Sequence, residues 1–93
     1  MASDAQQVVI AYHEAQLAML AEMVAAATDR YRAGEIDVFA LDEIIHQYHE
    51  AARKLWVFCW GPGGNRAARD IERMAAEGEA IDWWSRGEFR RQR

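Results

Sequence analysis

The sequence contains only one cysteine and one proline, and all six of its glycines follow residue 33. A single cysteine, Cys59, excludes an internal disulfide and a multi-cysteine metal site, so we expect it to be a small buried apolar residue. With no proline or glycine before residue 34, nothing interrupts a helix in the first third of the chain. The composition therefore argues against a disulfide-stabilised secreted fold and favours long helices.

The N-terminus lacks the basic region and uninterrupted apolar run of a signal peptide, and no later stretch has the ~20 apolar residues that span a membrane. We therefore expect a cytoplasmic protein with no membrane segment. The net charge of −4 argues against a general nucleic-acid binder, but the charge is unevenly distributed. Residues 1–52 carry nine acids and two bases, whereas residues 53–93 carry six acids and nine bases. The basic part is expected to dock on the acidic part.

The chain is short, and this limits the core that it can form by itself. A domain of 93 residues buries only about 60–65% of the surface that its unfolded chain exposes. One domain over residues 1–93 fits this length, and a partner chain would add apolar contacts. We expect that partner to be a second copy, in a homodimer, with another protein as an alternative.

Two long helices are predicted from capping residues and from apolar residues spaced three and four apart. The first covers residues 4–32 and begins with a capping box that starts at Ser3. The second covers residues 37–60 and follows a turn at Gly34, with Asp37 as its N-cap. The first seam contains Val9, His13, Gln16, Leu20, Met23, Ala27 and Tyr31, and the second contains Leu41, Ile44, Tyr48, Ala51, Leu55 and Phe58. The short connection predicts an antiparallel helical hairpin.

The last third of the chain is predicted to form two shorter helices. Pro62 and the glycines around it end the second long helix. A third helix follows over residues 65–77. A short helical tail over residues 80–91 starts at either Asp82 or Ser85, since each can serve as an N-cap.

The predicted tail is too apolar to be left free, because it contains two tryptophans, an isoleucine and a phenylalanine. We expect it to fold over the open end of the hairpin, near Trp56 and Trp60. The predicted fold class is therefore all-α, a long antiparallel hairpin with two short C-terminal helices. Two such hairpins in a homodimer would form a four-helix bundle.

One face of the second helix has the residue types of a metal site. Glu43 and His46 have the Glu-x-x-His spacing of carboxylate-bridged metal bundles, and His49 and Glu50 follow within one turn. The first helix has no second motif of this kind, so only a homodimer would complete a divalent metal site. The alternative is a solvated charged face, with Glu50 paired to Lys54. No other cofactor is expected.

A ligand pocket is the alternative interpretation of two polar residues in the first seam, His13 and Gln16. Burying a polar group without a partner costs roughly 1–3 kcal/mol, so each should form a hydrogen bond. Both residues could simply be satisfied in the core, or fix the register of a helical assembly. With Trp56, Trp60 and Trp84, they are the candidate ligand-pocket residues, because His13 is expected at the level of Trp56.

A basic patch is predicted in the last third of the chain. Three arginines share one face of the third helix and two more lie in the tail, but acidic residues interrupt them. The patch consists of Arg66, Arg69, Arg73, Arg90 and Arg91. Weak nucleic-acid binding is the third functional hypothesis that it supports.

No catalytic residue is predicted, since neither Cys59 nor Ser85 has a histidine partner that is evident from the sequence. The preferred interpretation is a non-enzymatic interaction or regulatory protein that works through a helical dimer surface. The alternative is a helical bundle that binds a metal or a small ligand.

Overall fold

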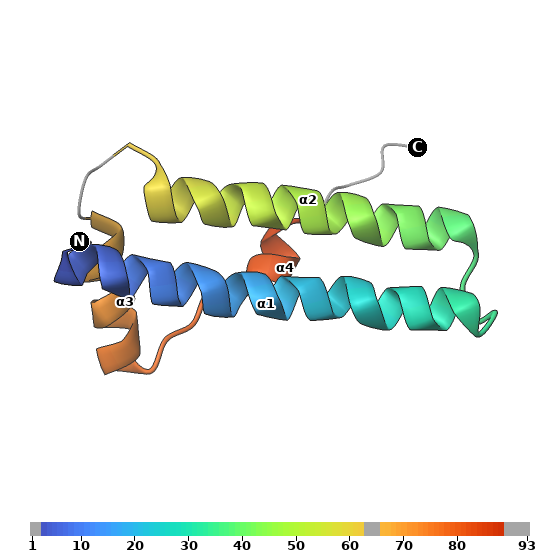
Figure 1. The fold of residues 1–93 in the computed structure, drawn as a ribbon, viewed down its shortest axis with the longest axis horizontal. Coiled ribbons are helices and arrows are strands. Elements are labelled where there is room, and N and C mark those ends of the chain that lie inside the picture. Colours follow the sequence, from blue (N-terminus) through green and yellow to red (C-terminus); the bar gives the residue numbers. More distant parts are fainter. Residues whose placement is uncertain (1–2, 63–65, 89–93) are drawn as a thin grey trace.

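The computed structural model describes residues 3–62 and 66–88, which form four helices. Their bounds are Asp4–Arg32 (α1), Val38–Trp60 (α2), Arg66–Glu77 (α3) and Trp83–Arg86 (α4). There is no strand in these residues. The predicted all-α class is therefore confirmed (Figure 1).

The two long helices start at the predicted caps. The Ser3 hydroxyl accepts a hydrogen bond from the Gln6 N–H at 3.2 Å, and the Ser3 N–H donates to the Gln6 side chain at 3.0 Å. The carboxylate of Asp37 accepts from the Ala40 N–H at 2.8 Å, which starts α2. Between them, Gly34 has a φ of 78°, the left-handed conformation that glycine adopts without strain.

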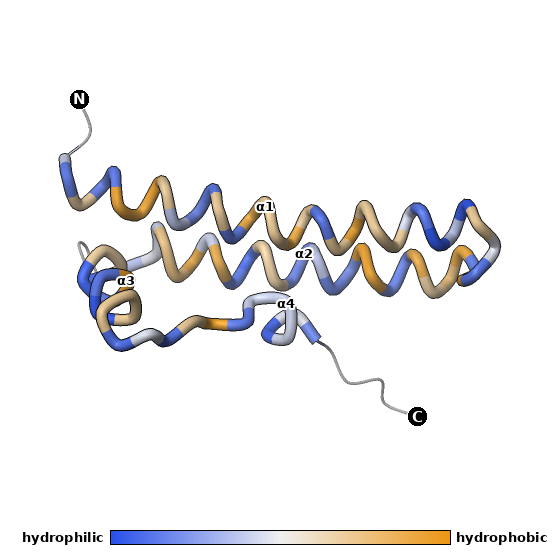
Figure 2. Tube along the Cα trace, turned by 90° about the horizontal axis from the view of Figure 1, so that it is seen from below, coloured by the Kyte–Doolittle hydropathy of each residue, from blue (hydrophilic) through white to orange (hydrophobic). Residues whose placement is uncertain are grey.

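The α1 and α2 helices lie side by side and run in opposite directions, and they form the longest contact in the molecule (Figures 1 and 2). Both α3 and α4 pack on the same side of this α1–α2 pair (Figure 2). We call this the covered side. No described element lies on the opposite side of the pair, which leaves one side of each long helix without an intramolecular neighbour.

The core lies between the α1–α2 pair and the two short helices. Leu55 is the only large side chain in the described residues that is completely buried. Two small residues of α3, Ala67 and Ala68, let that helix approach the α1–α2 pair closely. The core cluster consists of Val9, Leu20, Ala51, Leu55, Cys59, Ala67, Ala68 and Trp83. Four of these are predicted seam residues, whereas the seam residues Met23 and Tyr31 are exposed.

The tail starts at Asp82, one of the two predicted caps, whose carboxylate accepts from the Ser85 N–H at 3.2 Å. The helix itself spans only Trp83–Arg86, within the predicted range 80–91. Residues 89–91 of that range, and the predicted cap Asn65 of α3, lie outside the described residues.

The prediction that the tail covers Trp56 and Trp60 is wrong. Trp83 is buried on the covered side, where its ring lies 5.3 Å from that of Phe58 and its Nε1–H donates to the Tyr12 hydroxyl at 2.7 Å. Trp56 and Trp60 remain exposed. The tail packs across the middle of α2, because that is where a complementary aromatic pocket and hydrogen-bonding side chains are available.

By length and composition alone, α1 is apolar enough to cross a membrane. The core helices of soluble proteins and signal sequences meet the same criterion. In this molecule the apolar character arises because α1 has apolar residues on two sides, one that faces the other helices and one that does not.

Candidate functional site

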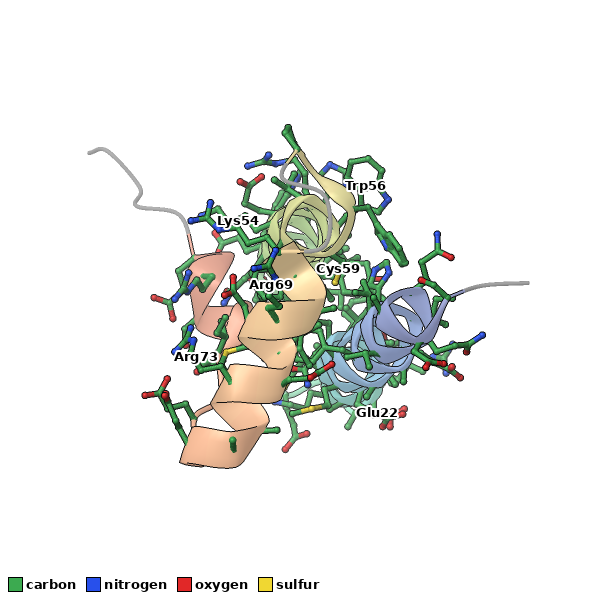
Figure 3. The ribbon with its side chains drawn as sticks, turned by 90° about the vertical axis from the view of Figure 1, so that its left-hand side faces the viewer. Glu22, Lys54, Trp56, Cys59, Arg69 and Arg73 are labelled. Carbon is green, nitrogen blue, oxygen red and sulfur yellow. The ribbon has the colours of Figure 1, made fainter. Side chains whose placement is uncertain are left out.

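An apolar stripe runs along α2 on the side away from α3 and α4. Trp56 points away from these helices, whereas Lys54 points toward α4 (Figure 3), and the Trp56 side chain is 55% exposed. Ala52, Ile45 and Val38 precede Trp56 by 4, 11 and 18 residues, which are close to one, three and five helical turns. All four residues therefore lie on the same side of α2.

The first helix continues this surface. Tyr12 and Met19 of α1 face the tail, since Tyr12 binds Trp83 and Met19 lines a groove with it. Ile10 and Leu17 each lie two residues before these positions, which turns them away from the tail, and Leu17 is partly buried against the core cluster. Ile10 is 43% exposed. The surface formed by Ile10, Leu17, Val38, Ile45, Ala52 and Trp56 is called the open face below, and within it Leu17 and Ala52 are partly buried against the core cluster.

His13 and Trp60 form a polar contact between α1 and α2. The Trp60 Nε1–H donates to His13 Nδ1 at 3.0 Å, and the two rings meet edge to face at 6.3 Å. His13 therefore has the hydrogen-bond partner that its place in the seam required. The partner lies one turn further along α2 than Trp56, the residue expected at this level.

Gln16 and Trp84 line a second feature, a groove of about 250 Å³ between α1 and the tail. Met19, Leu20 and Met23 form its wall on α1, and Ile81, Asp82 and Trp83 form its wall on the tail. The five predicted ligand-pocket residues are thus not brought together. His13 contacts Trp60, Gln16 shares the groove with Trp84, and Trp56 lies on the open face.

The Glu-x-x-His face of α2 carries local side-chain pairs. His46 lies 3.3 Å from Asp42, and Glu50 lies 2.6 Å from Arg53, which lowers the pKa of the Glu50 carboxyl through their hydrogen bond. The expected pairing of Glu50 with Lys54 is wrong. Among the residues that the structure describes, no three acidic, histidine or cysteine side chains gather as metal ligands, Glu43 and His49 included.

Two side chains that the sequence did not assign to the tail hold it in place. The Gln47 amide donates to the Trp84 carbonyl at 2.9 Å, and the Lys54 ammonium donates to the Arg86 carbonyl at 2.7 Å. The partners are 37 and 32 residues apart in the chain, so no local pattern identifies them. Lys54 was instead interpreted as part of the solvated face of α2.

The predicted basic patch is partly neutralised. Arg73 lies within 4 Å of three carboxylates, those of Asp70, Glu77 and Glu79. Arg66 and Arg69 are exposed on α3. Arg90 and Arg91 fall outside the described residues.

The two candidate nucleophiles have environments that do not activate them. Burial raises the pKa of the Cys59 thiol to about 11, which keeps it protonated at neutral pH. The Ser85 hydroxyl donates to the Asp82 carboxylate at 2.7 Å as part of the cap of α4, and no histidine contacts it in the described part of the chain.

No protein family, curated protein or solved structure has detectable similarity to this chain.

Proposed function

We propose that this protein is a small, non-enzymatic interaction protein whose open face pairs with a second copy of the chain. The observation that carries this proposal is the apolar stripe that continues across both long helices on the side that α3 and α4 leave uncovered. Each α1–α2 pair acts as an antiparallel hairpin, and two hairpins form a four-helix bundle.

The spacing of the stripe supports a helical partner. Ile10, Leu17 and Val24 follow one another at seven-residue intervals in α1, and Val38, Ile45 and Ala52 do so in α2. A seven-residue apolar repeat is the pattern by which helices pack along their length. Because both helices carry it on one face, the face matches another pair of helices, and a second copy supplies such a pair.

The small core supports the same proposal. Ten hydrophobic residues of the described chain are buried, and four of them are alanines. Ten large hydrophobic side chains are exposed, among them Ile10, Val38, Ile45 and Trp56 of the open face and Trp60 at its edge. A face of this kind contributes to stability when a partner removes it from water, at roughly 25 cal/mol per Å² of apolar area.

The proposal is tested by light scattering on the peak eluted from a size-exclusion column at micromolar concentration. We expect a mass twice that of the 10.7-kDa chain. Ile45→Glu places two charges in the paired face, and we expect it to weaken the dimer about a hundredfold or more. Its circular dichroism should retain the helical signal, since Ile45 is 44% exposed within one chain.

Phe39→Glu is the matched control, because Phe39 is 75% exposed but lies about a quarter turn from the stripe residue Val38. This variant should remain a dimer. A wild-type chain that is monomeric throughout contradicts the proposal. If the monomer floats with phosphatidylcholine vesicles, the open face is assigned to a lipid surface instead.

A further inference from the structure

The groove between α1 and the tail lies on the covered side and is independent of the proposed pairing. Its walls are mostly apolar, and Trp84 provides aromatic surface on one side, next to the buried Trp83. Met19 and Met23 lie opposite, and Met19 is 63% exposed. Methionine side chains adapt their shape and make favourable sulfur contacts with aromatic rings. Such walls match a flat aromatic molecule.

One polar group in the groove has no protein partner. The half-buried Gln16 side chain lines the groove, and its amide forms no hydrogen bond within residues 3–62 and 66–88. An amide oxygen in this position can accept a hydrogen bond from a ligand with an N–H or O–H group. The amide oxygen then fixes the orientation of the ligand.

Charge restricts the ligand further. Among the described residues that line the groove, Asp82 is the only charged one. Its carboxylate accepts from the N–H and the hydroxyl of Ser85, and these hydrogen bonds lower the Asp82 pKa, so the group is ionised at neutral pH. A negative charge on a ligand would be repelled at this position.

We propose that the groove binds a small aromatic molecule that carries an N–H or O–H group and no negative charge. Gln16 accepts the hydrogen bond, Trp84 and the methionines contact the ring, and Asp82 excludes anions. The volume of about 250 Å³ is below that of most drug-sized pockets, so the ligand is the size of one or two fused rings.

Three probes with the same ring test this proposal: indole, its cationic derivative tryptamine and its anionic derivative indole-3-acetate. Binding is followed on ¹⁵N-labelled protein by the side-chain N–H signals of Gln16, Trp83 and Trp84. We expect saturable shifts for indole and tryptamine, with dissociation constants of about 1 mM for so small a ligand. Indole-3-acetate should bind at least about tenfold more weakly.

Gln16→Leu removes the acceptor and should weaken indole binding about threefold to tenfold. Gln7→Leu is the matched control on the same helix and should bind as the wild type. Met19→Ala tests the wall at an exposed position where folding is unaffected, and it should also weaken binding. Shifts confined to Trp56 and Trp60, equal binding of the anion, or no saturation at about 10 mM indole would each overturn the proposal.

Discussion

The two sides of the α1–α2 pair are both apolar, but in the described residues only one of them is covered by a segment that hydrogen bonds hold in place. On the covered side, Tyr12, Gln47 and Lys54 each bind a group of the tail. On the open face, the nearest hydrogen bond between elements is that of His13 with Trp60, at its edge. Apolar periodicity therefore marks a surface for packing, and the polar groups around it specify the segment of the chain that packs there.

The largest expected difference between the two sides concerns their tryptophans. In the Ile45→Glu background, Trp83→Ala should reduce the free energy of unfolding by about 3–5 kcal/mol, because it leaves a cavity and removes the partner of Tyr12. Trp56→Ala should change it by less than about 0.5 kcal/mol, since this side chain lies in solvent within one chain. Urea unfolding followed by circular dichroism measures both, and equal losses would contradict the distinction.

A smaller loss in the free energy of unfolding is expected from a substitution where the tail crosses α2. A Cβ on Gly87 would clash with the Gln47 carbonyl and lie 2.8 Å from the Ala51 Cβ. Gly87→Ala should therefore cost about 1–3 kcal/mol by the same measurement, as the tail moves away from α2. Glu88→Ala, at an exposed neighbour, should leave stability unchanged. If Gly87→Ala is as stable as the wild type, the close packing of the tail is wrong.

The smallest expected change in the free energy of unfolding appears at alkaline pH. The pKa of Cys59 is raised from 9.0 to about 11 by burial, so between these values the unfolded chain has lost a proton that the folded chain retains. Stability contributed by the neutral thiol is complete below pH 9 and decreases as the pH rises, by at most about 1.4 kcal/mol per pH unit. Burial also raises the pKa of the Tyr12 hydroxyl, so its ionisation should lower the stability further at higher pH.

This alkaline loss is measured by urea unfolding at pH 8.5, 9.5 and 10, in the wild type and in Cys59→Ala. The variant is less stable at every pH because of its smaller side chain, but the difference between the two proteins should become smaller as the pH rises. A difference that is constant across this range would show that the Cys59 thiol ionises as easily in the folded chain as in the unfolded one.

The helix starts could be predicted because their signals are local. Ser3, Asp37 and Asp82 each cap a helix through a residue three positions away, and the seams follow from helical spacing. The position of the tail could not be predicted in this way. It depends on contacts such as that of Trp83 with Tyr12, 71 residues apart, and many apolar surfaces of the long helices offered an alternative.

The candidate sites were predictable only in part. His13 was correctly expected to need a partner, because a polar residue in an apolar seam has few ways to satisfy its hydrogen bonds. Lys54 was assigned to Glu50, since an i, i+4 pair is the usual role of a lysine on a helix. Its actual partner is the Arg86 carbonyl, and a main-chain oxygen has no signature in the sequence.

Gln47 and Lys54 hold main-chain oxygens, which every amino acid possesses. These two hydrogen bonds are therefore independent of which side chains stand at Trp84 and Arg86. The side chains contribute separately, since Trp84 packs against the core cluster and the Arg86 guanidinium lies 5.7 Å from the centre of the Trp83 ring. The tail is thus held in two ways, through main-chain oxygens that any substitution would keep and through side chains that a substitution would change.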